Sequence, residues 1–375
     1  MLELHRDRVV TLYAVHSWAG VLFAVLIFIV CTSGAVAVFG EEIDHWSNPA
    51  LRAATGPVEV TADEALARLT AVTGQAAGDG ALLGLPQPGR AYYSLPHPRP
   101  EERLHRVYLD ATSGALMAER QSHLYWYLRH LHVRLLSPWN GRLFVGMVGL
   151  AMLLSIVTGV LIHRHLFRDL FRLRWRPAKG GRTLMAELHK WVGVWGLVFH
   201  LMIALTGTWL ALAGYLSPAL EAARGGARPV VAPAPPALRS GPPPDLATLI
   251  DAAVAQVPGL VPTFLRIQPD AGDGVHVTVH GNLPDTLVQH AVTQVRFRAA
   301  DGALLSVHDA RTAGFWVQFR DALEPLHYGY FGGFWLKLLY LLMGLMPALL
   351  SLTGALIWFD RRQRLRGGRA VVPTP

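Results

Sequence analysis

Long apolar stretches alternate with polar segments along the chain. Four of them, residues 9–39, 143–162, 184–216 and 334–359, carry few charges over at least the roughly 20 helical residues that cross a bilayer core. The first contains the small-residue sequence Ala35-Val36-Ala37, but its apolar run is much longer than the roughly 7–15 residues of a signal peptide. The pattern therefore predicts four transmembrane helices, the first of them an uncleaved anchor.

The two long segments between the spans carry the same series of shorter elements. After Thr61 an amphipathic run predicts a capped helix, and residues 105–116 predict two strands around a turn. In the second segment residues 246–257 predict the helix, and residues 295–304 predict a hairpin that turns at Asp301-Gly302. A proline-rich stretch, residues 228–245, predicts an extended linker.

Basic residues gather in three short segments beside the spans. They are Arg6 and Arg8; Arg164, Arg168, Arg172, Arg174, Arg176, Lys179 and Arg182; and Arg361, Arg362, Arg364, Arg366 and Arg369. The positive-inside rule makes these segments cytoplasmic, so both termini are expected inside and the two long segments outside. Topology thus accounts for much of the net charge of +8, and binding to nucleic acid is not needed to explain it.

The sequence therefore predicts an α-helical membrane protein with four transmembrane helices in two parallel repeats and two small α+β periplasmic domains. The expected order is a tail and first span (1–40), a periplasmic domain with an interfacial helix (41–140), a second span (141–166), a basic loop (167–183), a third span (184–216), the linker and second domain (217–332), a fourth span (333–360) and a basic tail (361–375).

An internal repeat aligns histidines in the two halves. His16 in span one precedes Gly34 by 18 residues, and His189 in span three precedes Gly207 by the same number. His132 and His327, just before spans two and four, each precede a Thr-Gly pair whose glycine lies 27 residues further on. An even number of spans separates the two copies, so they are expected to share one orientation across the membrane.

The repeat places histidines at two depths. In an up-down-up-down bundle, spans one and three are diagonal neighbours, so His16 and His189 are expected to face each other near the cytoplasmic side. His132 and His327 form a second pair at the outer side. His200, eleven residues after His189, is expected on nearly the same helix face and about 16 Å closer to the outer surface, beside the outer pair. His163, at the inner end of span two, is a further candidate for the inner site.

The composition narrows the chemistry of these pairs. The chain has 17 histidines but one cysteine, which excludes a covalent c-type haem and an iron–sulfur ligand set. Carboxylates are absent from the span interiors. Two facing imidazoles in an apolar slot with nearby glycines are typical of a non-covalent b-type haem, although a single buried histidine is more often a core residue. No Gly-rich nucleotide motif follows a suitable strand.

The chain resembles the PepSY-associated transmembrane proteins, which include bacterial inner-membrane ferric-siderophore reductases. The resemblance rests on three motifs: His16-x-x-x-Gly20 with Thr-Ser-Gly34, the run from Phe39 to Pro49 after span one, and His189-Lys-Trp-Val-Gly193 with Thr206-Gly207. Residues 107–116 look like the end of a PepSY module, and residues 245–310 look like a more degenerate copy.

The resemblance implies a reductase with two b haems that carries electrons from the cytoplasm to a periplasmic ferric siderophore or similar chelate and releases Fe(II). The haem iron ligands would be His16, His189, His132, His327 and His200, with His163 also at the inner haem. Because the sequence ends shortly after span four, the expected donor is a separate reductase or a membrane quinol.

Two other functions fit the same pattern. One is a haem-free sensor or accessory protein whose outer domains bind a periplasmic peptide or protein. The other is a metal or proton transporter that uses the histidines as a path, although the spans lack the carboxylates usual in a coupled ion path.

Overall fold

The computed structural model describes residues 6–75, 80–96, 106–118, 123–137, 140–163, 180–223, 243–270, 274–284, 286 and 291–367. Most of the predicted basic loop and of the proline-rich linker, and the end of the basic tail, lie outside these residues.

Four helices in the described part of the chain are long and apolar enough to cross a membrane, as the sequence predicts. Their spans are Asp7–Ala37, Gly141–Ile162, Leu197–Leu216 and Tyr330–Arg364. They lie in α1 (Arg6–Ala37), α6 (Gly141–Ile162), α9 (Leu197–Ala223) and α12 (Gly333–Gly367). Many large apolar side chains on them point outward, among them Leu22, Val198 and Leu342. The protein is therefore a multi-pass membrane protein.

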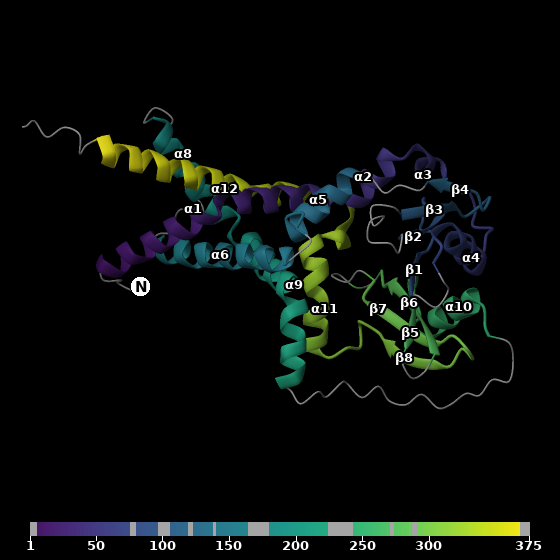
Figure 1. Cartoon of the computed structure of the whole chain (residues 1–375). Helices are drawn as coiled ribbons and strands as arrows, with labels where there is room; N and C mark the ends of the chain where they lie inside the picture. Colours follow the sequence, from purple (N-terminus) through teal and green to yellow (C-terminus); the bar gives the residue numbers. More distant parts are fainter. Residues whose placement is uncertain are drawn as a thin grey trace, which may run out of the picture.

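The spans pack as a ring in which each contacts two neighbours. Helix α1 packs against α6 and α12, α6 also packs against α9, and α12 packs against α8 (Gly181–Trp195), which leads into α9 (Figure 1). The first and third spans are therefore diagonal to each other. Both ends of the chain point away from the sheet, so the bundle has a terminal side and a sheet side.

The third span is not the single helix predicted over residues 184–216. Helix α8 ends at Trp195, and α9 begins at Leu197 after the linking residue Gly196. The imidazole of His200 lies against Gly196 so closely that a side chain there would overlap the ring. The break therefore lets a histidine one turn further along pack against the backbone of the helix.

Each of the two segments outside the spans contributes a helix and four strands, and the two sets of strands join in one eight-stranded sheet, a junction that the prediction of two small domains did not include. The strands are β1 (Ala81–Gly84), β2 (Tyr92–Pro96), β3 (Arg106–Asp110), β4 (Leu116–Ala118), β5 (Val261–Asp270), β6 (Gly274–Asn282), β7 (Thr293–Arg298) and β8 (Leu304–His308). They are antiparallel in the order β4-β3-β2-β1-β5-β6-β7-β8, and β1 pairs with β5 from Ala81 opposite Ile267 to Gly84 opposite Phe264. Each half would otherwise expose an edge strand, and joining the halves removes two such edges.

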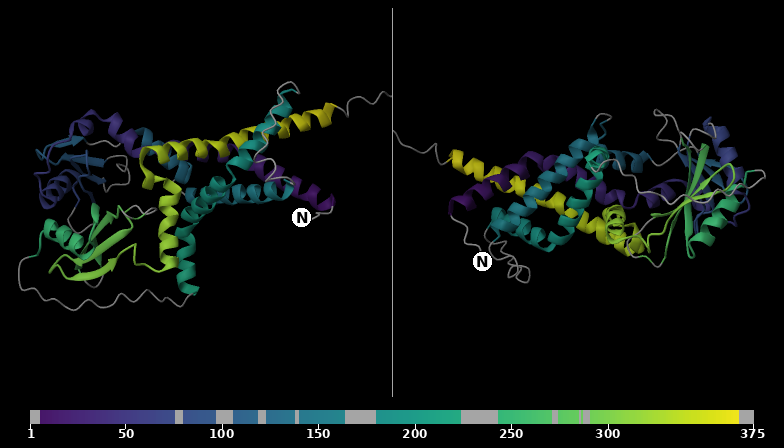
Figure 2. Two further views of the ribbon diagram at one scale, coloured as in Figure 1. Left: turned by 180° about the vertical axis from the view of Figure 1, so that it is seen from behind. Right: turned by 90° about the horizontal axis from the view of Figure 1, so that it is seen from below.

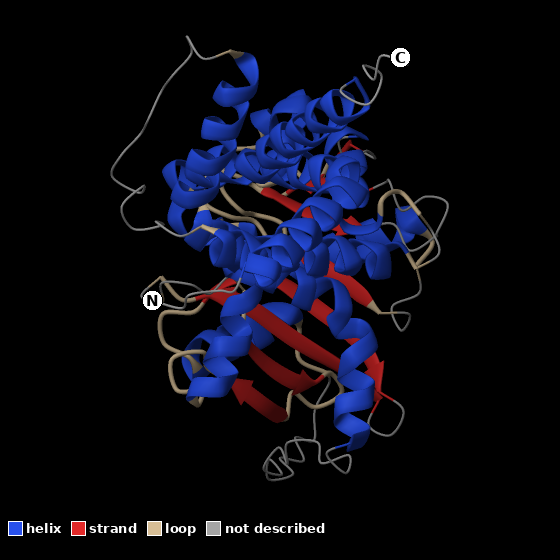
Figure 3. Cartoon of the chain, turned by 90° about the vertical axis from the view of Figure 1, so that its left-hand side faces the viewer, coloured by secondary structure: helices blue, strands red, loops and turns tan. Residues whose placement is uncertain are grey.

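One face of the sheet carries the apolar core. Helices α4 (Ala62–Thr73) and α10 (Leu246–Gln256) cover this face on the side away from the spans, and residues of both halves form one buried cluster. Thr61 caps α4, as the sequence predicts, and Asp245 caps α10. Asp63 of α4 also accepts a hydrogen bond from the backbone N–H of Leu246 in α10. The opposite face carries polar side chains, among them Ser94, Arg106 and Arg266, and it looks toward the bundle, whose helices lie in front of the strands in Figure 3.

Short helices join the sheet to the spans. They are α2 (Gly40–Ser47), α3 (Pro49–Ala53), α5 (His123–Arg134), α11 (Phe315–Tyr328) and the 3-10 turn η3 (Tyr330–Gly332). Helix α11 packs against α9, and α5 packs against α1. Figure 2 shows the resulting shape from behind and from below, with the sheet at one end and the spans at the other.

An ion pair fastens the sheet-side ends of the first and last spans. The ammonium of Lys337 on α12 lies 2.7 Å from a carboxylate oxygen of Glu42 on α2, and the Lys337 side chain is only 8% exposed. Beside it, the rings of Phe39 and Phe334 meet edge to face, 5.9 Å apart. The Phe-Gly-Glu-Glu sequence after span one therefore contacts span four.

We expect Lys337→Met to lower the free energy of unfolding by roughly 1–3 kcal/mol, because it leaves the partly buried Glu42 carboxylate without its partner. The double variant Glu42→Met with Lys337→Met should recover most of this loss. Thermal unfolding of the purified protein in detergent measures both, with the exposed Arg364→Gln as a control that changes stability by less than about 1 kcal/mol. Equal losses in the single and double variants would contradict this account.

Candidate functional site

The terminal-side pair consists of His16 on α1 and His189 on α8. Their ring centroids are 6.3 Å apart, and the ring planes are nearly perpendicular, at 88°. The two helices are diagonal in the bundle, so the pair bridges its interior from opposite sides. The structure thus brings these two histidines together as the sequence spacing predicts.

The sheet-side pair consists of His132 on α5 and His327 on α11. Their centroids are 5.9 Å apart and their planes are inclined by only 27°. Burial lowers the pKa of both imidazoles, that of His327 to about 3, so both rings are neutral near pH 7. Neither histidine belongs to a span, and each reaches the bundle from a joining helix.

Each of the four imidazoles packs against a neighbouring helix, where its Nδ1 atom meets a carbonyl or hydroxyl oxygen and its ring lies over a glycine; we call each such site a socket. Nδ1 of His16 lies 3.0 Å from the Ser155 carbonyl oxygen, and Nδ1 of His132 lies 2.7 Å from that of Val30. The Nδ1 atoms of the other two lie 2.9 Å (His189) and 3.0 Å (His327) from the hydroxyls of Thr353 and Thr206. A carbonyl oxygen can only accept a hydrogen bond, so the first two Nδ1 atoms are donors.

The threonine hydroxyls fix the remaining two rings in the same tautomer. Thr353 donates its own hydrogen to the Leu349 carbonyl, and Thr206 donates its hydrogen to the Met202 carbonyl. Each hydroxyl is then left as an acceptor, so Nδ1–H of the histidine donates to it. All four histidines therefore present an unprotonated Nε2, the atom with which a neutral imidazole binds a metal.

A glycine follows the hydroxyl residue in every socket and leaves room for the ring. The glycines, each with the histidine that a Cβ atom would meet, are Gly34 (His132), Gly159 (His16), Gly207 (His327) and Gly354 (His189). The hydroxyl residues before them, Ser33, Thr158, Thr206 and Thr353, are all buried. Each Ser-Gly or Thr-Gly pair of the repeat thus accommodates the ring of a histidine from a neighbouring segment.

The spacing within both pairs fits one metal ion between two imidazoles. Two metal–imidazole bonds of about 2.0–2.1 Å place ring centroids roughly 6–6.5 Å apart when both Nε2 atoms point at the metal. The separations of 6.3 and 5.9 Å lie at this value. Within the described residues no group of three or more His, Cys, Asp or Glu side chains has the geometry to hold a metal. The remaining ligands of such a metal would come from a cofactor.

A cavity of about 630 Å³ surrounds the terminal-side pair, within the roughly 300–1,000 Å³ of small-molecule and cofactor sites. Its wall is mostly apolar and includes Gly20, Gly193 and Pro347, and two basic residues, Lys190 and Arg361, also line it. Such a wall fits a flat, largely apolar cofactor that carries acidic substituents.

His163 and His200 also line this cavity. The structure places His200 in the wall of the cavity that contains the terminal-side pair, and its expected place beside His132 and His327 stays a prediction. His200 is 2% exposed, and its Nε2 is buried without a hydrogen-bond partner. The cavity reaches along α1 from His16 to Ile27, about 16 Å by helical rise, so His200 lies between the depths of the two pairs.

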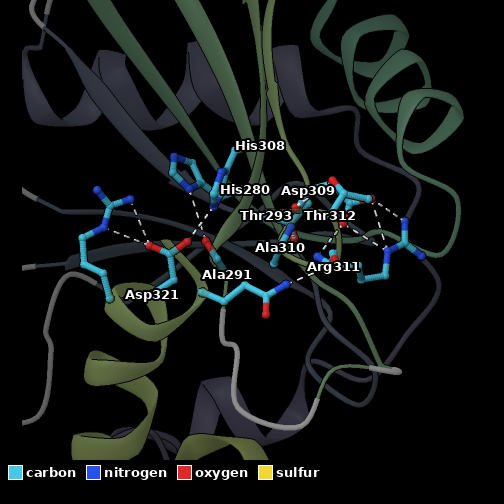
Figure 4. Close-up of polar contacts among 11 residues, drawn as sticks. His280, Ala291, Thr293, His308, Asp309, Ala310, Arg311, Thr312 and Asp321 are labelled. Atoms are coloured by element: carbon cyan, nitrogen blue, oxygen red, sulfur yellow. Dashed lines mark hydrogen bonds and ion pairs between the residues drawn. The ribbon is translucent and has the colours of Figure 1, made fainter. Parts of the chain in front are cut away.

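A second cavity, of about 900 Å³, separates the polar face of the sheet from α2, α9 and α11. Trp209, two residues after the socket glycine Gly207, and Glu324, one turn before His327, lie in its wall. The sheet-side pair is therefore about one helical turn from this cavity. Figure 4 shows one joint beside it, where His308 of β8 contacts Asp321 of α11 at 2.7 Å.

The fold and this arrangement define a class of protein: a four-span membrane protein with two stacked pairs of socketed histidines and one extramembrane sheet. Residues 13–361 match the family model of the PepSY-associated TM region, so the chain belongs to this family.

One relative is an uncharacterized protein of Pseudomonas aeruginosa, which is 33% identical over 260 residues. The match covers 63% of this chain and 63% of that protein, so the chain spans less than two thirds of its relative.

Several residues that shape the site were not predicted from sequence. Gly34 and Thr158 were part of the repeat, but nothing in their spacing showed that each contacts a histidine from another helix. The pair of Glu42 with Lys337 joins positions 295 residues apart, and the arginines of the second cavity are scattered over several elements.

We expect Gly34→Ala to destabilise the protein by about 1–3 kcal/mol, because the added methyl group overlaps the His132 ring in a packed region. Gly20→Ala on the same helix is the matched control. Nothing lies within 4 Å of its Cβ position, so alanine should be neutral or stabilise the helix by up to about 1 kcal/mol. Thermal unfolding of both variants measures the difference, and similar effects at the two positions would contradict the socket geometry.

Proposed function

We propose that the protein holds two b-type haems and passes electrons through the bacterial inner membrane, from the cytoplasmic side to a ferric chelate at the sheet. The observation that carries this proposal is the socket repeated four times, which gives two pairs of neutral imidazoles with fixed tautomers at two depths.

The donor set favours haem over a free metal ion. Each site offers two nitrogen ligands and, in the described residues, no third metal-binding side chain. Zinc sites usually take four protein ligands or three with an open position, whereas a haem iron already has four nitrogens and needs two axial ligands. A bound haem supplies reversible one-electron chemistry at its iron.

The residues of this chain would hold the haems, balance their charge and exclude water. His16 with His189, and His132 with His327, would provide the axial nitrogens, and the sockets would keep each ring from rotating. Lys190 and Arg361 would neutralise the acidic groups of the haem at the terminal side. The glycines and apolar side chains would keep water away from both sites.

The two sites are in series. Along α1, His16 and the Val30 carbonyl that receives His132 are 14 residues apart, about 21 Å by helical rise. A haem held at each pair would shorten the gap between the two sites, and His200 lines the cavity that extends from the terminal-side pair. Two haems held in this way would span most of a bilayer core of about 30 Å.

The ferric chelate would bind in the second cavity, next to the sheet-side pair. Reduction to Fe(II) weakens the hold of hard oxygen ligands on the iron, so one electron releases the metal without breaking a bond within the chelator. The basic segments beside the spans favour cytoplasmic termini, which would put this cavity in the periplasm. A cytoplasmic reductase or a membrane quinol would supply the electrons.

The reduced-minus-oxidised absorption spectrum of the purified protein tests the cofactor directly. We expect two haems b per chain, one lost in His16→Ala or His189→Ala and the other lost in His132→Ala or His327→Ala. His200→Ala and His163→Ala should keep both, as should the control His280→Ala on the sheet. A protein without a Soret band, in which these variants change nothing, would support the haem-free sensor instead.

Anaerobic stopped-flow mixing tests the reaction. The reduced protein should be reoxidised by a ferric chelate, and one Fe(II), trapped by a ferrous-specific dye, should appear for each electron lost. Removal of the sheet-side haem by His327→Ala should slow the reoxidation of the protein by the ferric chelate at least tenfold, while the other haem remains reducible. Reoxidation at an unchanged rate would contradict the proposed order of the sites.

A further inference from the structure

The cavity under the sheet has a basic roof and an acidic floor. Its roof is the polar face of the sheet, where Arg106 of β3 and Arg266 of β5 point into it. Its floor is formed by the joining helices, with Glu41 and Asp44 on α2 and Asp321 and Glu324 on α11. Arg90 and Arg320 also line it, so equal numbers of basic and acidic groups surround the space.

Most of the acidic groups already have partners. Glu41 pairs with Arg90 at 3.1 Å, and Asp321 receives His308 at 2.7 Å and Arg320 at 3.2 Å. Burial raises the pKa of Asp321, but the hydrogen bonds and charges of His308 and Arg320 lower it further, so the pKa lies below its ordinary value. The Asp321 carboxylate is therefore ionised and already paired. Asp44 also has an interaction partner.

The two roof arginines are free by contrast. In the part of the chain that the structure describes, neither Arg106 nor Arg266 has a carboxylate within ion-pairing distance. They lie on strands three positions apart in the sheet, which separates them by about 14 Å. The charges available to a bound molecule are therefore two guanidinium groups on opposite sides of the roof, and Glu324 on the floor.

Flat and neutral surfaces lie beside each of the two arginines, with Tyr92 and Tyr108 on β2 and β3 near Arg106 and Phe264 and His280 on β5 and β6 near Arg266. Phe264 and His280 stack at 4.3 Å, and Tyr92 and Tyr108 meet edge to face at 5.6 Å. Burial lowers the pKa of His280 to about 4, and the neighbouring Arg266 acts in the same direction, so this ring is neutral. A molecule in the cavity therefore meets two positively charged groups, each with aromatic rings beside it.

We propose that this cavity selects anionic ferric chelates, whose carboxylate or phenolate oxygens pair with Arg106 and Arg266. Guanidinium groups match such oxygens in both charge and geometry, and a volume of about 900 Å³ suits one drug-sized complex. The identification of the iron chelate rests on the proposed function, whereas the preference for negative charge rests on the cavity alone.

A haem held by the sheet-side pair would supply one electron to the Fe(III) of the chelate and would itself be oxidised by one unit. The chelated iron would become Fe(II), and the chelator would leave unchanged. The arginines take no part in this electron transfer, because they act on binding.

Redox-inert gallium(III) complexes test the preference without any electron transfer. Calorimetry on the full-length protein compares the negatively charged gallium–citrate complex with the positively charged complex of gallium and desferrioxamine B. We expect the anionic complex to bind at least tenfold more tightly. Arg106→Gln and Arg266→Gln should each weaken it about tenfold and reduce the salt dependence of binding, whereas Arg266→Lys should weaken it less.

Arg296→Gln is the matched control, because Arg296 projects from the same face of the sheet but does not line the cavity. It should change the affinity less than twofold, and unchanged thermal midpoints show that the variants fold. Equal binding of the two complexes by the unmodified protein, or equal effects of Arg296→Gln and Arg266→Gln, would overturn the proposal. Selective binding by a protein that lacks haem would instead leave the anion site standing and end the proposed reductase function.

Discussion

The hydrogen bond from each histidine Nδ1 to the neighbouring helix is the interaction on which the rest of the site depends. A buried imidazole with no partner is costly, and one that rotates freely does not present a fixed ligand atom. The socket solves both difficulties with a carbonyl or hydroxyl acceptor and a glycine. Since every socket lies on a different segment from its histidine, the same bonds also tie the helices of the bundle together.

This arrangement explains why the sheet and the bundle form one structure. His132 and His327 come from α5 and α11, which join the sheet to the spans, so their sockets on α1 and α9 anchor the sheet side of the molecule. The pair of Lys337 and Glu42 and the contact between His308 and Asp321 strengthen the same junction. The result is a cavity with one wall on the sheet and another one turn from a histidine pair.

The predictions from the sequence that rest on periodicity and equal spacing agree with the structure. The apolar runs define the four spans, and the separations of 18 and 27 residues place His16 with His189 and His132 with His327. Features that depend on contacts between residues distant along the chain, or on the fit of one side chain against the backbone, could not be predicted in this way. The pairing of β1 with β5, which merges two expected domains, depends on two edge strands meeting. The helix break at Gly196 lies against the His200 ring, and this contact between a ring and a glycine could not be read from periodicity.

The ring planes provide the most direct test of the central claim, that each socketed pair holds one haem. Electron paramagnetic resonance of the oxidised protein at low temperature distinguishes perpendicular from near-parallel axial imidazoles. The angles of 88° and 27° predict two low-spin ferric signals, a highly anisotropic one that is lost in His189→Ala and a rhombic one that is lost in His327→Ala. A protein with no low-spin haem signal, or with signals unaffected by either substitution, would contradict the account.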